Sequence, residues 1–205
     1  MSQIENGIRS ILSHPKVYDL FQELMGAHKV RTDFVENYVK PSLTDCILDI
    51  GCGTADLLAY LPESIRYFGY DQSQSYIDHA VQQFGSRGTF KCALVDTVEV
   101  SQLPEIDIAI ASGLIHHLSD RQTITLLETA HSALAGGGRF IAIDPCYKKG
   151  QHFIAKSIID RDRGESVRDQ PGYKNLARIV FTNIDSYVVH RKWIPYTHHI
   201  MVCSK

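Results

Sequence analysis

The sequence lacks several features that would each point to a particular class of protein. It contains no run of 18 apolar residues, so we expect no membrane-spanning helix, and its first residues lack the apolar segment of a signal peptide. It has no basic excess, because 21 lysines and arginines stand against 23 aspartates and glutamates. Its five cysteines are widely spaced and form no Cys-x-x-Cys pair. We therefore expect a soluble cytoplasmic protein with no disulfide framework, no metal site and no nucleic-acid or membrane partner.

The length and composition are those of a folded domain. The chain has 205 residues, of which 44% are hydrophobic, and a chain of this length can bury about 70% of its unfolded surface. Residues 1–45 have the apolar spacing of amphipathic helices, which Pro41 ends. The pattern changes at residue 46, so we divide the chain into an N-terminal helical part, 1–45, and a main domain, 46–205.

From residue 46, short apolar runs alternate with amphipathic helices, which is typical of a mostly parallel sheet with helices on both faces. The expected parallel strands are 46–50, 65–71, 89–95, 106–112 and 139–144. Two more runs, 183–191 and 194–203, are joined almost directly, which predicts an antiparallel hairpin at the end of the sheet. Helices are expected at 73–85, 119–135, 151–160 and 173–181, with a polar loop at 160–172. The predicted fold is α/β: a doubly wound, seven-stranded, Rossmann-like sheet with an antiparallel last strand.

One segment, ILDIGCGTAD at residues 47–56, joins a buried strand to a glycine-rich turn and a helix start. Gly51 and Gly53 let the backbone approach a ligand without a Cβ clash. In a doubly wound sheet this turn lies at the carboxyl edge of the strands, where ligands bind. Asp71 ends the next strand, 22 residues after Asp49, where a carboxylate can accept both ribose hydroxyls of an adenosine cofactor. Alternatively, Asp71 caps the helix that Gln72 and Ser73 open.

Position 56 discriminates between adenosine cofactors. A dinucleotide fingerprint requires glycine or alanine there, whereas this chain has Asp56, and a carboxylate would repel a pyrophosphate. A nicotinamide cofactor is therefore disfavoured. A cofactor without phosphates at the turn, such as S-adenosyl-L-methionine, fits the pattern.

The motifs along residues 15–145 resemble those of class I S-adenosylmethionine-dependent methyltransferases of the small-molecule type. The resemblance implies that Asp71 binds the ribose, that Asp96 and Thr97 lie at the adenine edge, and that the strand ending at Ser112 lies under the methionine moiety. It also implies the product S-adenosyl-L-homocysteine and a small-molecule methyl acceptor as partner. Ala55 departs from the pattern, because the family often has a third glycine there. The candidate cofactor-binding residues in the main domain are Asp49, Gly51, Gly53, Asp71, Gln72, Asp96, Thr97 and Ser112.

The N-terminal part contributes two more candidates. In several families of this class an arginine in the region of Arg31 binds the methionine carboxylate, and the guanidinium fork suits that pairing. Tyr18 lies on the same segment, which commonly folds over the cofactor as a lid. The resemblance therefore implies that residues 1–45 form a helical lid, with Arg31 and Tyr18 as cofactor-binding residues. Alternatively, Arg31 is a solvated helix charge and Tyr18 packs in the core.

Two adjacent histidines, His116 and His117, follow the fourth expected strand and so lie at the ligand edge of the sheet. A hydroxyl that accepts a methyl group must lose its proton during attack, and histidine, with an ordinary pKa near 6.5, suits that task. His116 is similar to the general-base histidine of small-molecule O-methyltransferases. We name His116 and His117 as catalytic candidates. Alternatively, both pack on the adenosine or bond the backbone.

Three other functions stay open at this point. An N-methyltransferase would need no base, because a neutral amine attacks directly. A nucleic-acid methyltransferase is disfavoured by the charge balance and by the absence of an Asn-Pro-Pro-Tyr type motif after the fourth strand. A non-catalytic protein that binds S-adenosylmethionine would show binding without turnover.

Overall fold

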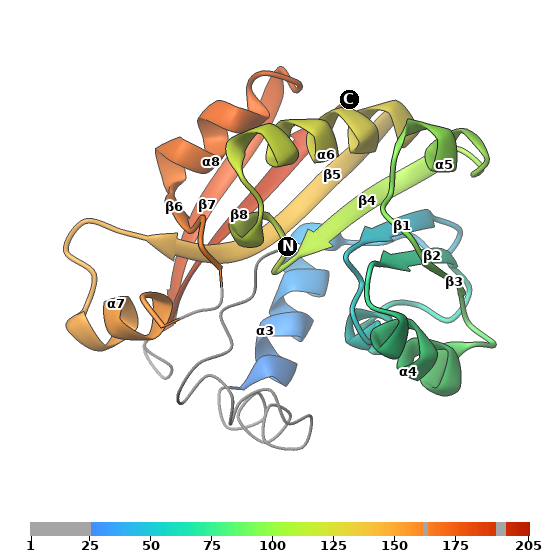
Figure 1. Ribbon diagram of the computed structural model, residues 1–205, viewed down its shortest axis with the longest axis horizontal. Coiled ribbons are helices and arrows are strands. Elements are labelled where there is room, and N and C mark those ends of the chain that lie inside the picture. The colour runs from blue at the N-terminus through green and yellow to red at the C-terminus, as the bar shows by residue number, and fades with distance from the viewer. Residues whose placement is uncertain (1–25, 162–163, 192–195) are drawn as a thin grey trace.

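The structure is a computed structural model that describes residues 26–161, 164–191 and 196–205. Its centre is a sheet in the order β3-β2-β1-β4-β5-β8-β7, and the two-residue strand β6 pairs with β5 off this path. The strands β1 to β5 run parallel to one another, whereas β8 is antiparallel to both β5 and β7 (Figure 1). This order confirms the predicted seven-stranded, doubly wound sheet with an antiparallel end. The strands are β1 Cys46–Ile50, β2 Arg66–Asp71, β3 Thr89–Cys92, β4 Ile106–Ser112, β5 Leu134–Tyr147, β6 Arg168–Asp169, β7 Asn183–Arg191 and β8 Tyr196–Ser204.

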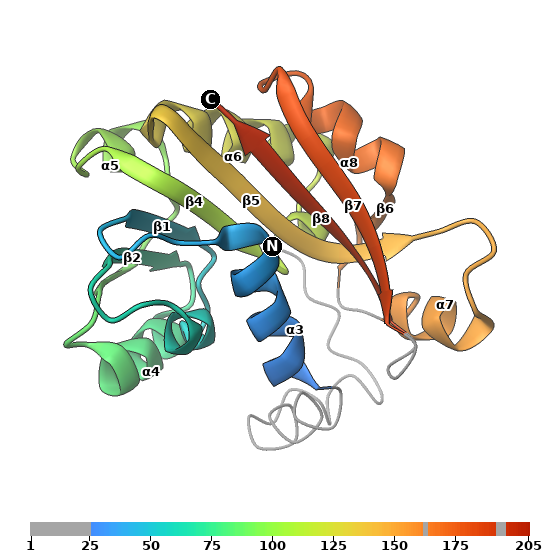
Figure 2. The same cartoon turned by 180° about the vertical axis from the view of Figure 1, so that it is seen from behind.

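Helices cover both faces of the sheet, as both ribbon views show (Figures 1 and 2). One face carries α5 (Thr97–Ser101), α6 (Asp120–Ala133) and α8 (Gln170–Ala177), which bury a core that contains Leu127 and Tyr173. The other face carries α3 (Ala27–Phe34) with its π-helical continuation η1 (Val35–Val39), the 3₁₀ helix η2 (Asp56–Tyr60) and α4 (Gln74–Phe84). Each helix turns an apolar stripe toward the sheet, as its spacing predicts. The remaining helices are the 3₁₀ turn η3 (Ile115–His117) and α7 (Phe153–Ile159).

Several boundaries differ from the sequence prediction, and the strand expected at 139–144 is longer at both ends, Leu134–Tyr147. The helix expected to reach residue 135 ends at Ala133, because β5 begins at once at Leu134. The strand expected to reach residue 95 ends at Cys92. The helix after the glycine turn is only the single 3₁₀ turn η2. The helix expected from residue 173 begins at Gln170, because the side chain of Asp169 accepts a hydrogen bond from the backbone N–H of Gly172 and caps it.

Three apolar residues of the described N-terminal part belong to the core. Phe34, Val35 and Val39 are buried in the cluster beneath α4 and η2. The guanidinium of Arg139 on β5 donates to the carbonyls of Val39 and Lys40, which anchors the end of this helix. Tyr18 lies outside the described residues, and the division into a lid and a main domain stays a prediction. Among the described helices, none has the length and apolar character that spanning a bilayer would require.

Candidate functional site

The glycine-rich turn follows β1 directly and is held by β2. The backbone N–H groups of Gly51 and Cys52 both donate to the carbonyl of Tyr70, at 2.8 and 2.9 Å. Gly51 and Gly53 have φ angles of +73° and +55°, the left-handed region that favours glycine. A Cβ on Gly51 would lie 2.9 Å from the side chain of Leu114, whereas a Cβ on Gly53 would meet nothing within 4 Å. The turn is therefore packed at Gly51 and open at Gly53.

Ala55 also adopts a left-handed conformation, with φ of +59°, and is fully buried. The family's frequent glycine at this position therefore has a conformational reason here as well as a packing reason, because a Cβ costs energy in this region. Alanine tolerates the strain because the turn on either side is hydrogen-bonded.

Asp71 lies at the end of β2, against the glycine turn. Its Oδ2 accepts a hydrogen bond from the backbone N–H of Gly53 at 3.0 Å, and its Oδ1 accepts one from the N–H of Ser73 at 2.8 Å. The structure thus brings two predicted cofactor residues together. Ser73 is the N-cap residue of α4, but its hydroxyl pairs with that of Ser75 and bonds no helix N–H.

Asp49 is buried on β1, two residues before the turn, and is 2% exposed. The hydroxyl of Tyr67 donates to its Oδ2 at 2.6 Å, and its Oδ1 has no hydrogen-bond partner. Burial raises the pKa of Asp49 to about 7, against a smaller lowering by the Tyr67 hydrogen bond. A buried carboxylate oxygen without a partner among the described residues is costly, so Oδ1 is suited to accept a hydrogen bond from a further group.

The other predicted cofactor residues line the same edge of the sheet. Asp96 caps α5, because its Oδ1 accepts from the backbone N–H groups of Val98 and Glu99, and Thr97 is the first residue of that helix. Gln72, after β2, and Ser112, at the end of β4, are exposed. These positions leave their side chains accessible at the carboxyl ends of β2, β3 and β4.

Arg31 reaches the glycine turn but is engaged there by another side chain. Its guanidinium donates to Oδ2 of Asp56 at 2.9 Å, and the hydroxyl of Thr54 donates to the other oxygen of Asp56. The pairing ties α3 to η2. It also shows that Asp56, the residue that disfavours a dinucleotide in the sequence pattern, holds the N-terminal helix against the turn.

His116 lies on the short helix η3 after β4 and is 5% exposed. Its Nδ1 lies 2.8 Å from Oδ1 of Asp144 on β5, and the same oxygen accepts from the backbone N–H of His116 at 3.1 Å. Burial raises the pKa of Asp144, and the hydrogen bond with His116 lowers it in part. The ring of His117 packs on that of His116 with centroids 4.0 Å apart. The sequence prediction identified His116 but not Asp144, its partner 28 residues away.

The segment before α8, which was predicted to be a polar loop, forms hydrogen bonds with the turn that carries His116. The guanidinium of Arg168 donates to the carbonyls of Ile115 and Leu118 on either side of His116, and it pairs with Asp120 at 2.7 Å. The backbone N–H of Ser166 donates to the carbonyl of His116 itself. No local spacing in the sequence links these residues to His116.

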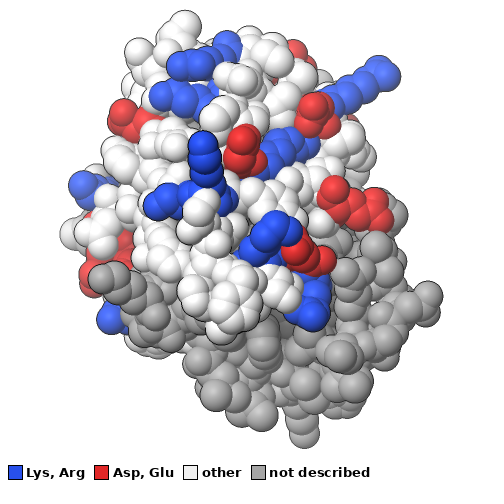
Figure 3. Space-filling model, turned by 90° about the vertical axis from the view of Figure 1, so that its left-hand side faces the viewer, with Lys and Arg blue, Asp and Glu red and all other residues white. Residues whose placement is uncertain are grey.

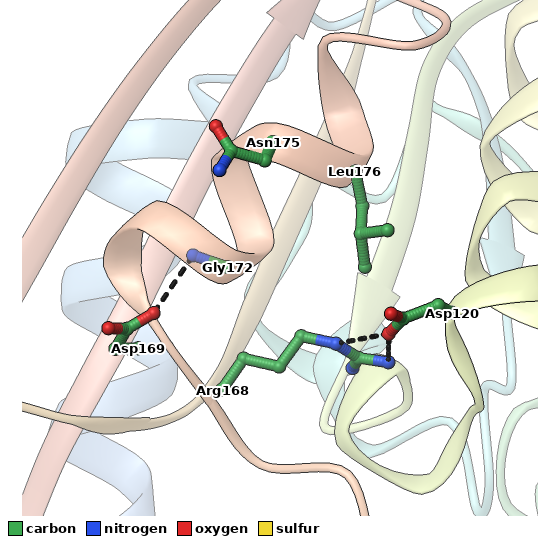
Figure 4. Close-up of a pocket in the computed structure, with 6 residues that line it drawn as sticks. All are labelled: Asp120, Arg168, Asp169, Gly172, Asn175 and Leu176. Atoms are coloured by element: carbon green, nitrogen blue, oxygen red, sulfur yellow. Dashed lines mark hydrogen bonds and ion pairs between the residues drawn. The ribbon is translucent and has the colours of Figure 1, made fainter.

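Gly164 lies directly against His116, because a Cβ at this glycine would overlap the imidazole ring. A pocket of about 420 Å³ lies beside Arg168, between the start of α6 and α8 (Figure 4). The Arg168 side chain points across it to Asp120, so its charge is already balanced. On the described part of this face, lysine and arginine side chains are interspersed with acidic ones and form no continuous basic stripe (Figure 3).

The comparisons with known proteins agree with this geometry. Residues 48–140 match a family model described as a methyltransferase domain. The fold is similar to that of the pyocyanin biosynthetic protein PhzM, with a TM-score of 0.72, 16% identity and coverage of 98% of this chain and 62% of that chain. It is also similar to human N-acetylserotonin methyltransferase, solved with S-adenosylmethionine, with a TM-score of 0.67, 19% identity and coverage of 91% and 55%.

A third similar structure is a putative O-methyltransferase from Nostoc punctiforme, with a TM-score of 0.69, 16% identity and coverage of 94% of this chain and 61% of that one. The chain thus covers between 55% and 62% of these three proteins. A search of the curated proteins found no match. The strand order and the glycine turn are those of the class I methyltransferase fold, which is Rossmann-like. Residues 48–140 thus match a methyltransferase domain, and human N-acetylserotonin methyltransferase, which has a similar fold, was solved with the cofactor S-adenosyl-L-methionine.

The residues of the turn fit this cofactor. The open side of Gly53 gives a ligand access to the backbone, and Asp71 beside it presents a carboxylate at the sheet edge. The unpartnered Oδ1 of Asp49 provides a negative group for a cation, and S-adenosylmethionine carries a sulfonium and an ammonium group. The individual contacts of the predicted cofactor residues stay predictions.

Proposed function

We propose that the chain transfers the methyl group of S-adenosyl-L-methionine to a hydroxyl of a small molecule, with His116 as general base. The observation that carries this proposal is the buried pair of His116 and Asp144 at the carboxyl ends of β4 and β5. The turn of His116 also borders the glycine turn, because the Leu114 side chain packs at Gly51. A base and a cofactor turn thus share one edge of the sheet.

The cofactor supplies a methyl group on a sulfonium, which needs no metal and no further activation. Asp71 and Asp49 would hold its ribose and its cationic end. With Asp144 against Nδ1, a proton on that nitrogen is hydrogen-bonded to the carboxylate, which makes Nε2 the basic nitrogen. His116 then takes the proton of the acceptor hydroxyl, and the buried carboxylate of Asp144 stabilises the imidazolium that forms.

Two further points support a small acceptor. Two of the similar structures are enzymes of this kind by name: one is N-acetylserotonin methyltransferase and the other is a putative O-methyltransferase. On this chain, His116 is almost fully covered, with Gly164 against its ring. A covered base suits an acceptor small enough to enter beside it rather than a macromolecule that docks on the surface.

The test is a screen with labelled S-adenosylmethionine over phenols, sugars, carboxylates and amines, followed by His116→Ala and His117→Ala on the acceptor found. We expect His116→Ala to lower turnover about 10²–10⁴-fold with cofactor affinity unchanged. The rate should rise with pH through a histidine titration that the variant lacks. The loss in His117→Ala should be smaller.

Wild-type turnover by His116→Ala on the true acceptor would contradict the assignment. Transfer would then depend on proximity and an already neutral amine, and N-methylation would replace O-methylation as the reaction.

A further inference from the structure

The structure contains a tyrosine–aspartate pair beneath the glycine turn, and the mechanism above uses only the aspartate of this pair. Tyr67 and Asp49 are each 2% exposed and lie on the neighbouring strands β2 and β1. The Tyr67 hydroxyl occupies Oδ2 of Asp49 at 2.6 Å and leaves Oδ1 unpartnered. The pair therefore presents one oxygen of the carboxylate and blocks the other.

The tyrosine ring is held in place from several sides. A Cβ on Gly88 or on Gly69 would lie 2.9 or 3.0 Å from the Tyr67 ring, so both glycines allow its close approach. The ring of Phe90 packs against it with centroids 5.8 Å apart. A rigidly packed donor fixes the rotation of the carboxylate that it binds, because the hydrogen bond tolerates little change of angle.

The electrostatic surroundings of Asp49 call for a cation. Burial and the charge of Asp71 both disfavour its ionised form, and the Tyr67 hydrogen bond is the influence that favours it. The thiol of Cys52 adds no positive charge, and the nearby guanidinium of Arg31 is engaged by Asp56. A cationic ligand group beside Oδ1 would supply the missing partner and the missing charge together.

We propose that Tyr67 is a positioning residue for cofactor binding: it holds Oδ2 of Asp49 so that Oδ1 receives the ammonium group at the amino-acid end of S-adenosylmethionine. The proposal rests on the placement of the cofactor at the glycine turn under the proposed function. It adds a residue that carries no charge and that lies outside the glycine motif.

Tyr67→Phe tests the proposal, with Tyr70→Phe as the matched control on the same strand, since Tyr70 is also buried but faces the opposite core. Binding of S-adenosyl-L-homocysteine, which keeps the ammonium group, is measured by calorimetry from pH 6 to 9. We expect Tyr67→Phe to weaken binding about tenfold to hundredfold at pH 7. The loss should shrink as pH rises, because removal of the donor raises the pKa of Asp49. A purely structural role would lower affinity equally at every pH.

Two further arms separate the possible failures. 5′-Methylthioadenosine lacks the ammonium group, so its affinity should be equal in wild type, Tyr67→Phe and Tyr70→Phe. If Tyr67→Phe weakened the binding of this probe as much as it weakens the binding of S-adenosyl-L-homocysteine, the proposal would be overturned. Asp49→Asn should lose the binding of S-adenosyl-L-homocysteine. If Asp49→Asn loses binding while Tyr67→Phe binds normally, Tyr67 has no positioning role. If Asp49→Asn also binds normally, Asp49 itself is outside the cofactor site.

Discussion

Replacing Asp49 by asparagine should stabilise the protein without cofactor while weakening cofactor binding. The structure raises the pKa of Asp49 from 3.8 to about 7, mainly through burial. Between these two pH values the unfolded chain releases the proton and the folded chain keeps it. The free energy of unfolding therefore falls as pH rises, by about 1.4 kcal/mol per pH unit and by about 4 kcal/mol in all. Above pH 7 both states are ionised and the loss is complete.

The assay is urea unfolding of wild type and Asp49→Asn, without cofactor, at several values from pH 4 to pH 8. Asparagine does not titrate, so the stability of the variant relative to wild type should grow by up to about 4 kcal/mol over this range. The growth should end once the folded carboxyl is ionised. A difference in unfolding free energy that does not change with pH would refute the reasoning. So would a wild type that becomes more stable relative to the variant as pH rises.

Three other changes have expected outcomes. Asp144→Asn removes the charge against His116 and should lower turnover about tenfold to hundredfold with cofactor affinity unchanged, measured by steady-state kinetics and calorimetry. Arg168→Lys loses the fork that bonds both flanks of the His116 turn; it should lower turnover and reduce the unfolding free energy by about 1–3 kcal/mol, with cofactor affinity unchanged. Ala55→Gly should raise the unfolding free energy by about 1 kcal/mol in urea, because glycine relieves the left-handed strain; no gain would mean that the lost methyl packing offsets the relief.

The architecture was predictable because its signals are local. Each strand of the parallel part is a short apolar run followed by a turn, and the pairing of such runs follows from their alternation with helices. The start of α6 was equally clear, since Ser119 and Gln122 form the reciprocal capping box that their spacing predicts. The prediction of element boundaries failed at residues whose local pattern suits both a helix and a strand. Leu134 continues the apolar face of α6 and also begins β5, and the strand pairing decides the outcome.

The candidate site was predictable only where it follows the glycine motif. Gly53 and Asp71 follow two neighbouring strands in the sequence pattern, and the structure joins them by the hydrogen bond from the backbone N–H of Gly53 to the Asp71 carboxylate. The contact of Tyr67 with Asp49 could not be predicted from the sequence, because it depends on the register of β1 against β2, which no residue pattern specifies. The contact of Arg168 with the turn that carries His116 could not be predicted either, because it joins residues that lie far apart in the sequence.

The two halves of the site share one physical design. Asp49 beneath the glycine turn and Asp144 beneath the histidine turn are both 2% exposed, and burial raises the pKa of both. Each carboxylate is held by one neutral or weakly basic ring partner, Tyr67 or His116, rather than by a lysine or an arginine. A full counter-ion would stabilise the empty fold more, but it would also satisfy the carboxylate before a ligand arrives. Because Asp49 is left short of positive charge, a cationic group of the cofactor would be favoured beside it in the proposed site. The stability that the empty fold loses when Asp49 ionises and the proposed attraction of a cation to Asp49 are thus two consequences of the same missing charge.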